Sequence, residues 1–237
     1  MRPRKAAVLP GIVLAAAACG GGPVSDADPV LRYVALGDSY TVGTSVATEE
    51  RWPDQLAARL EAAPAPAGRL ELVANHAVNG YTSRDVVARA LPRLDGDGEI
   101  GFASLLVGVN DVVQGVPLED YRANVDTILA DLRGRLPADR IACVETPDYT
   151  VTPQGAAFGD PAEQRAGIER VNAILRERCQ ANGIAYVDGI FAISRDAATD
   201  PALVANDGLH PSGTQYRRWV SERIEPVVRA LLVTPAP

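Results

Sequence analysis

Short apolar segments alternate with amphipathic ones from residue 31 onward, and this alternation restricts the folds open to the chain. In each segment the hydrophobic residues are mostly continuous rather than alternating with polar ones, which is typical of strands covered on both faces of a sheet. There are five such segments, at Leu31–Leu36, Leu70–Asn75, Ala103–Val107, Ile141–Glu145 and Ile184–Val187. Strands that alternate with helices form parallel sheets. The sequence therefore predicts an α/β fold built on a doubly wound sheet of five parallel strands.

The segments between these strands show helical periodicity. Apolar residues recur at relative positions 0, 4, 7, 8 and 11 in Tyr121–Leu132 and again in Val220–Leu231, which is the spacing of one helical stripe. The shorter pattern Ile168–Leu175 predicts another helix. A further helix is expected from Trp52-Pro53, because proline is tolerated in the first turn. The 237 residues suit one domain of moderate size, or at most two small ones, with a sizeable core.

The N-terminus has the layout of an export signal. Basic residues at positions 2, 4 and 5 precede an apolar stretch, Ala6–Ala18, that is too short to span a bilayer as a permanent helix. The sequence Leu14–Cys19 resembles a bacterial lipobox, in which the cysteine is lipidated and becomes the new N-terminus. Ala16 stands where that motif usually has leucine, so a plain secretory signal is the alternative.

We therefore predict a signal peptide of the lipoprotein type at residues 1–18, with Cys19 as the lipid acceptor. The glycine-rich residues 19–30 are expected to form a flexible tether. The protein would then be exported, either as a lipoprotein anchored on the outer side of the cell membrane or in secreted form. Contact with a membrane is expected only through this anchor.

The charge balance excludes several partners and chemistries. The formal net charge is −7, and removal of the three basic residues of the leader leaves 20 basic against 30 acidic residues, or −10. Such a surface repels phosphate backbones, so no nucleic-acid partner is expected. Lys5 is the only lysine, which excludes Schiff-base and P-loop lysine chemistry from the mature chain. Two isolated histidines and the absence of a CxxC pair exclude a structural zinc site, and we expect no metal or other cofactor.

Two cysteines remain beyond the leader, Cys143 and Cys179. In an oxidising compartment they could form a disulfide. Packing explains them equally well as two buried thiols, one on a strand and one on a helix. Both interpretations stay open at this point.

Residues with possible catalytic roles follow three of the predicted strands, where parallel sheets bind their ligands. Ser39 lies in a Gly-Asp-Ser turn that can present its hydroxyl at the edge of the sheet. Gly80 lets a backbone N–H approach a ligand closely, and the side chain of Asn110 could donate to a developing oxyanion. The neighbouring Asp38 and Asp111 are expected to hold their turns.

A fourth motif precedes the last helix. Ser212 and Gln215 have the spacing of a capping box, so a helix is expected to begin at Ser212. His210 then lies on the preceding turn, and Asp207 can reach back to its imidazole. A carboxylate on one ring nitrogen fixes the tautomer and leaves the other nitrogen free to take a proton from a serine. His76 has no such partner in the sequence, and we expect it to be structural.

The order and placement of these motifs resemble the SGNH hydrolases, also called GDSL-type lipases and esterases. The resemblance covers about Leu31 to Leu232, and we assign residues 31–232 to one domain of this family. It implies a flavodoxin-like, three-layer α/β/α sandwich with a five-stranded parallel sheet. It also implies a triad of Ser39 as nucleophile, His210 as general base and Asp207 as orienting carboxylate, with no cofactor. The implied oxyanion hole comprises the backbone N–H groups of Ser39 and Gly80 and the side chain of Asn110.

The predicted function is that of an exported serine hydrolase, which cleaves carboxylic esters through an acyl-Ser39 intermediate. An α/β-hydrolase is a weaker match, because the Gly-x-Ser-x-Gly elbow is absent and Thr41 stands two residues after Ser39. Two alternatives are an acyltransferase that uses the same site and a non-catalytic surface-binding lipoprotein. An intact set of all five site residues argues against the second.

The loops suggest a small ester as the substrate. Most connections are too short for an inserted lid domain, which favours small or single-acyl-chain esters. The longer stretch Pro147–Pro161, with Tyr149, Val151 and Phe158, is expected to form one wall of the acyl site. Thr41–Arg51 is expected to form the opposite wall.

Overall fold

A computed structural model describes residue 1 and residues 29–233 of the chain. It contains one five-stranded sheet in the order β2-β1-β3-β4-β5, in which every pair of neighbouring strands is parallel. The strands are β1 (Val30–Gly37), β2 (Arg69–Asn75), β3 (Phe102–Leu106), β4 (Ile141–Val144) and β5 (Ala185–Val187). This is the flavodoxin-like strand order. The prediction of an α/β fold with five parallel strands is confirmed.

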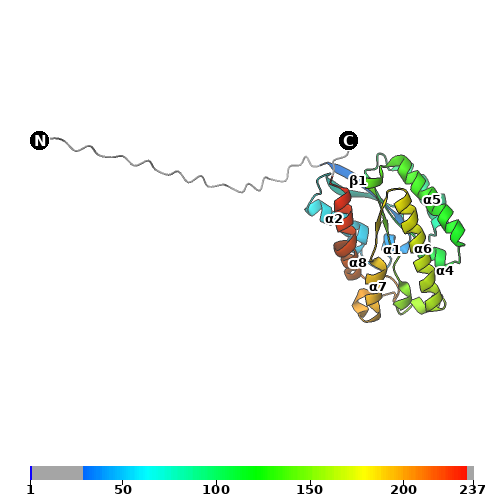
Figure 1. The fold of residues 1–237 in the computed structure, drawn as a ribbon. Helices are drawn as coiled ribbons and strands as arrows, with labels where there is room; N and C mark the ends of the chain where they lie inside the picture. The colour runs from blue at the N-terminus through cyan, green and yellow to red at the C-terminus, as the bar shows by residue number, and fades with distance from the viewer. Residues whose placement is uncertain (2–28, 234–237) are drawn as a thin grey trace.

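Helices cover both faces of this sheet (Figure 1). The α-helices are α1 (Ser39–Val42), α2 (Trp52–Ala62), α3 (Ser83–Asp85), α4 (Val109–Val113), α5 (Leu118–Arg135), α6 (Pro161–Ala181), α7 (Ile190–Ser194), α8 (Gly213–Trp219) and α9 (Glu225–Leu231). Two π-helical turns are η2 (Val86–Ala90) and η9 (Val220–Ile224). The 3₁₀ segments are η1 (Thr48–Glu50), η3 (Leu91–Gly96), η4 (Ala138–Arg140), η5 (Tyr149–Val151), η6 (Gly155–Phe158), η7 (Arg195–Ala198) and η8 (Pro201–Leu203).

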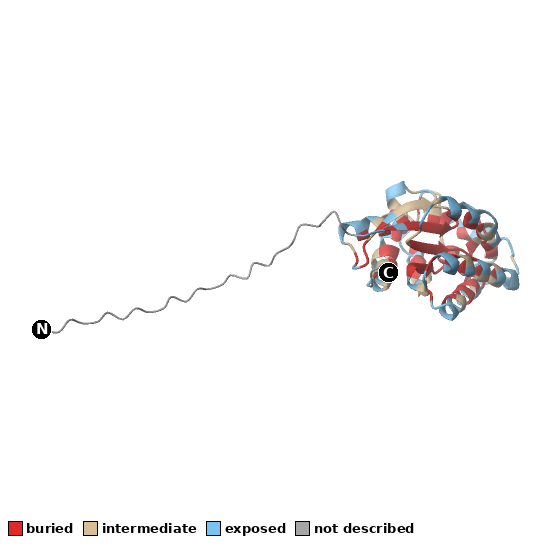
Figure 2. Cartoon of the chain, turned by 90° about the horizontal axis from the view of Figure 1, so that it is seen from above, coloured by how far each residue is buried: buried red, intermediate tan, exposed pale blue. Residues whose placement is uncertain are grey.

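The sheet separates two hydrophobic cores. Along β1 the side chains alternate between them: Tyr33 and Ala35 join the core beneath α2 and the C-terminal helices, whereas Val34 and Leu36 join the core beneath α5 and α6. This alternation follows from the two-residue period of a strand. Viewed from above, the strands form a buried layer between helices whose outer faces are exposed (Figure 2). Burial on both faces explains why the inner strands β3 and β4 are largely apolar, whereas the edge strand β2 is only partly buried.

The helical periodicity identifies the faces that the helices bury. All five residues of the first stripe, from Tyr121 to Leu132, are buried on α5. The second stripe, Val220–Leu231, is divided between the π-turn η9 and the α-helix α9. Pro226 lies just after this π-turn, and Pro92 lies just after η2. A proline cannot donate to the carbonyl four residues earlier and its ring clashes with it, which explains a wider turn at these two places.

The two cysteines beyond the leader belong to one core. Cys143 on β4 and Cys179 on α6 are buried free thiols rather than a disulfide. Burial, together with a hydrogen bond to Cys179, raises the pKa of the Cys143 thiol well above its ordinary value. Of the two sequence-based interpretations, the structure shows the packed thiols.

The predicted signal peptide and the acceptor Cys19 lie outside the described residues. The end of the predicted tether does not, and its last residue, Val30, already belongs to β1, where it pairs with Arg69 of β2. None of the helices within residues 29–233 is long and apolar enough to cross a membrane.

Candidate active site

The candidate site lies where the winding of the sheet reverses. From β1 the chain goes to β2 at one edge and then returns to β3 on the other side of β1. The connections that follow β1 and β3 therefore leave in opposite directions and open a crevice at the carboxyl ends of these strands. Ser39 follows β1 and Asn110 follows β3, so the topology brings both to this crevice.

Ser39 is the first residue of the short helix α1. Gly37 precedes it at φ +155°, and a Cβ there would lie 2.3 Å from the carbonyl oxygen of Leu106 on β3. Only glycine allows the chain to turn this sharply against the neighbouring strand. Asp38 caps the helix by accepting from the N–H of Tyr40 at 3.0 Å. These contacts fix the position of a serine that keeps 8% of its surface accessible.

His210 lies on the turn before α8, on the other side of the crevice. The turn is closed by Asp207, whose Oδ1 accepts the backbone N–H groups of Leu209 and His210, each at 2.9 Å. Gly208 supplies the positive φ of +71° that the turn needs. Ser212 caps α8 by accepting from the N–H of Gln215, as the spacing of these two residues predicts.

The structure brings Ser39, His210 and Asp207 into one chain of hydrogen bonds. His210 Nε2 is 2.9 Å from Ser39 Oγ, and His210 Nδ1 is 2.6 Å from Asp207 Oδ2. An ionised carboxylate can only accept, so Nδ1 carries the proton and Nε2 is free to accept from the serine hydroxyl. This is the arrangement that a general base needs in order to activate a serine.

Asp207 is held in its ionised form. Burial alone would raise its pKa, but hydrogen bonds from the His210 ring, from two backbone N–H groups and from Ser45 hold the pKa well below its ordinary value. Ser45 Oγ donates to Asp207 Oδ2 at 2.7 Å. Ser45 also has φ +66°, the one positive φ of a non-glycine residue in the described part of the chain. The sequence analysis missed this residue.

Asn110 and the Gly80 turn are joined to each other through α4. Asn110 Nδ2 donates one hydrogen to the carbonyl of Tyr81 at 3.0 Å, and Gln114 donates to the carbonyl of Gly80 at 3.1 Å. The primary amide of Asn110 has a second hydrogen, which stays available. Gly80 has φ +82°, and a Cβ there would meet nothing within 4 Å, so its conformation rather than its surroundings favours glycine.

A cavity of about 40 Å³ opens at these groups. Its walls combine polar site residues with apolar side chains: Ser39, Tyr40, Val109, Asn110, Val113, Tyr149, Phe158, Leu209 and His210. Tyr149 and Phe158 come from the stretch that the sequence predicts as a wall, whereas Val151 does not line the cavity. Gly80 does not line it either.

The prediction for Thr41–Arg51 is wrong in one respect. None of its residues lines this cavity. Instead, the segment contributes Ser45, which donates to Asp207, and Val109 and Val113 of α4 are among the residues that line the cavity. Loop length alone did not reveal that α4 contributes to the wall.

Of the two acidic side chains near the site, Asp38 holds its own turn by capping α1, as expected. Asp111 instead accepts from the backbone N–H and the hydroxyl of Ser83, which ties α4 to α3. Asp38 is fully buried, and only one of its oxygens has a hydrogen-bond partner among the described residues. Burial raises its pKa to about 7.

His76 is bonded to Asp97 at 2.5 Å and does not line the cavity, in agreement with a structural role.

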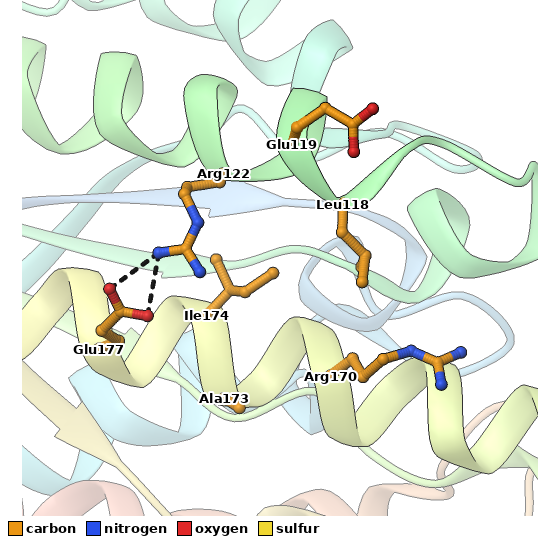
Figure 3. Close-up of a pocket in the computed structure, with 7 residues that line it drawn as sticks. All are labelled: Leu118, Glu119, Arg122, Arg170, Ala173, Ile174 and Glu177. Atoms are coloured by element: carbon orange, nitrogen blue, oxygen red, sulfur yellow. Dashed lines mark hydrogen bonds and ion pairs between the residues drawn. The ribbon is translucent and has the colours of Figure 1, made fainter.

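A much larger hollow, of about 430 Å³, lies elsewhere, between α5 and α6 (Figure 3). Arg122 on α5 reaches across it and pairs with both carboxylate oxygens of Glu177 on α6. Among the described residues, no serine, histidine or cysteine lines it. Of these two cavities, the smaller one therefore has the groups suited to catalysis. Within residues 29–233, no three histidine, cysteine or acidic side chains are grouped so as to hold a metal ion.

Comparison with known proteins agrees with the fold and the motifs. Residues 35–218 match the GDSL-like lipase/acylhydrolase family. No curated protein matches the chain. Among solved structures, TesA is similar at a TM-score of 0.64 and 17% identity, covering 84% of this chain and 99% of its own.

Two further structures have the same fold. The acetylxylan esterase Axe2 from Geobacillus stearothermophilus has a TM-score of 0.61 at 18% identity and covers 86% of this chain and 94% of its own. The psychrotrophic esterase EstA from Pseudoalteromonas sp. has a TM-score of 0.57 at 18% identity and covers 85% and 93%, respectively.

Proposed function

We propose that this chain, which belongs to the GDSL-like lipase/acylhydrolase family and is an ester-hydrolysing enzyme, acts through an acyl intermediate on Ser39. The observation that carries the proposal is the unbroken hydrogen-bond chain from Ser39 through His210 to Asp207. The distances along this chain are those that proton transfer from serine to histidine requires. No cofactor has a part in this mechanism.

In the proposed mechanism, Ser39 Oγ attacks the ester carbonyl while His210 Nε2 takes the hydroxyl proton. Asp207 stabilises the imidazolium that results. The N–H groups of Ser39 and Gly80 and the free amide hydrogen of Asn110 stabilise the oxyanion. His210 then gives the proton to the leaving alcohol, and a water molecule, activated by the same histidine, releases the acid.

The proposed substrates are small or single-acyl-chain esters. The cavity at Ser39 is small, and its apolar walls suit an acyl group better than a charged one. Axe2, which shares the fold, is described as an acetylxylan esterase. Esters of this size, such as O-acetyl groups on sugars, fit both observations.

The location is a proposal as well. A basic start, an apolar stretch and Cys19 support export, with the protein anchored by a lipid on the outer side of the cell membrane or secreted. An enzyme in this location would act on esters outside the cell rather than on cytosolic thioesters.

The test is hydrolysis of p-nitrophenyl acetate, butyrate and octanoate by the purified protein and by Ser39→Ala. We expect Ser39→Ala to lose activity to background, because Ser39 is the one hydroxyl bonded to the His210 ring within residues 29–233. Ser221→Ala, which changes a serine in η9 on the far side of α8, is the control and should keep full activity. An active Ser39→Ala protein would refute the mechanism.

Two further readouts separate the alternatives. The p-nitrophenyl ester of an alkylphosphonate should phosphonylate Ser39 Oγ with release of p-nitrophenol and label no other residue, as detected by mass spectrometry of the digested protein. Addition of an alcohol or sugar acceptor distinguishes hydrolysis from acyl transfer, because a transferase would form a new ester in place of the free acid.

A further inference from the structure

From the walls of the cavity we infer that Tyr149 and Phe158 limit the acyl group of the substrate to about two to four carbon atoms. This inference rests on the proposed acyl-Ser39 mechanism and adds the residues that set chain length. A cavity of about 40 Å³ has room for about three groups the size of a water molecule. An acetyl group fills such a space, and a chain of eight carbons exceeds it.

Tyr149 is a fixed part of the wall. Its side chain is buried, and its hydroxyl donates to Gln164 Oε1 of α6 at 2.5 Å. The preceding residue, Asp148, is buried and holds the loop through two contacts. Its backbone N–H donates to Ser194 Oγ at 2.8 Å, and its carboxylate accepts from Arg165 at 3.0 Å. A wall anchored in this way cannot move aside for a longer chain.

Phe158 closes the wall on the outside. Its ring packs edge-on against that of Tyr149, with centroids 5.6 Å apart, while 39% of the residue stays exposed. It therefore lies at the mouth of the cavity, between the acyl site and solvent. Removal of its ring extends the cavity outward without removing a buried part of the core.

The segment that carries Phe158 is held close to Tyr149. Gly155 lies against this residue so tightly that a Cβ would come within 2.0 Å of the Tyr149 carbonyl oxygen. Gly159 follows Phe158 at φ +131°, a conformation that other residues rarely adopt. The backbone thus holds the phenyl ring of Phe158 in place, so the limit on acyl length does not require a change of conformation when the substrate binds.

The remaining wall is formed by α4. Val109 and Val113 of α4 line the cavity together with the two aromatic side chains. A larger side chain at position 113 should reduce the space, whereas a smaller one at position 158 should increase it. The two substitutions therefore change the acyl preference in opposite directions.

The experiment compares kcat/KM for p-nitrophenyl acetate, butyrate and octanoate. Wild type should favour acetate and butyrate over octanoate. In Phe158→Ala the ratio of octanoate to acetate should rise by at least about tenfold, since one methylene in an apolar pocket changes kcat/KM by roughly 10–200-fold. In Val113→Phe the ratio of butyrate to acetate should fall. Leu118→Ala, another exposed apolar residue but one that lines the distant hollow, should leave all ratios unchanged.

The outcomes separate this inference from the mechanism on which it rests. If Ser39-dependent hydrolysis is present but wild type prefers octanoate, or Phe158→Ala keeps the wild-type ratios, the size limit is refuted and the mechanism stands. If no ester is cleaved and the phosphonate does not label Ser39, both are refuted. Phe158→Leu, which keeps an apolar side chain at the mouth, should retain most of the short-chain preference.

Discussion

At the scale of single residues, sequence reasoning located the groups that share a motif and missed those that act through tertiary contact. Ser39, Asp207 and His210 stand in short motifs at strand ends or before a helix, where their spacing alone suggests a role. Ser45 donates to Asp207 across 162 positions of the sequence and stands in no motif. Its unusual φ is a property of the folded backbone. A serine in a loop gives no signal from which such a contact could be predicted.

Asp38 provides a prediction at this scale, because its carboxyl is buried beside the nucleophile and its pKa is raised to about 7. The folded state therefore holds a proton on Asp38 between pH 4 and 7, whereas the unfolded state does not. Stability falls with rising pH wherever the folded state binds more protons. The contribution of Asp38 is thus fully present below its ordinary pKa, and it is lost as the pH rises toward about 7.

Asp38→Asn should remove this pH dependence. Asparagine still caps α1 by accepting from the N–H of Tyr40, but it carries no proton that can be lost. We expect the free energy of unfolding of Asp38→Asn, relative to wild type, to improve between pH 5 and pH 8 in urea titrations. Asp131→Asn, a change at a partly exposed carboxylate on the outer face of α5, is the control. A constant difference across this range would contradict the prediction.

At the scale of elements, hydrophobic periodicity predicted where strands and helices lie better than how they pack against one another. The five strands begin and end within one residue of the predicted limits, because a strand covered by helices on both faces is largely apolar along its length. The division of the C-terminal helix was missed, since its apolar stripe continues through Pro226. The proline is visible in the sequence, but the wider turn that accommodates it depends on packing.

The packing of α4 against α6 gives the prediction at this scale. Gly167 of α6 faces α4 so closely that a Cβ would lie 2.6 Å from Cγ1 of Val112. Valine has a stiff side chain, so the two helices must separate in Gly167→Ala. Overpacking of this kind costs about 1–3 kcal/mol of stability. Because α4 carries Asn110, we also expect kcat to fall while KM changes less.

A double variant tests the cause. Val112→Ala in the Gly167→Ala background removes the methyl group that clashes and should restore most of the stability and of kcat. Urea unfolding and steady-state kinetics on the four proteins of the cycle give the coupling energy between the two sites. Equal losses in the single and double variants would show that the defect arises elsewhere than at this contact.

At the scale of the whole molecule, the fold could be predicted from the sequence because each level of the argument agrees with the next. Apolar strands, amphipathic helices and catalytic motifs at strand ends all lead to one doubly wound sheet with its site at the reversal of the winding. The size of the acyl cavity could not be predicted in this way. It depends on how Tyr149 and Phe158 pack together, which only the assembled structure shows.

The leader makes a prediction about the molecule in its cell. The proposed attachment to the membrane is through a lipid on Cys19. Stable anchoring needs more than one acyl chain, since a single chain binds only weakly and reversibly. In bacteria grown with an alkynyl fatty acid, lipidation of Cys19 should label the wild-type protein, and an anchor of more than one acyl chain should carry it into the detergent phase. The Cys19→Ser protein should not incorporate the label. The Cys19→Ser protein keeps two cysteines, Cys143 and Cys179, and both are buried and therefore not accessible to acylation. Label on the Cys19→Ser protein would contradict the assignment of Cys19 as the lipid acceptor. An unlabelled wild type whose N-terminus begins at another residue would instead indicate a plain secretory signal.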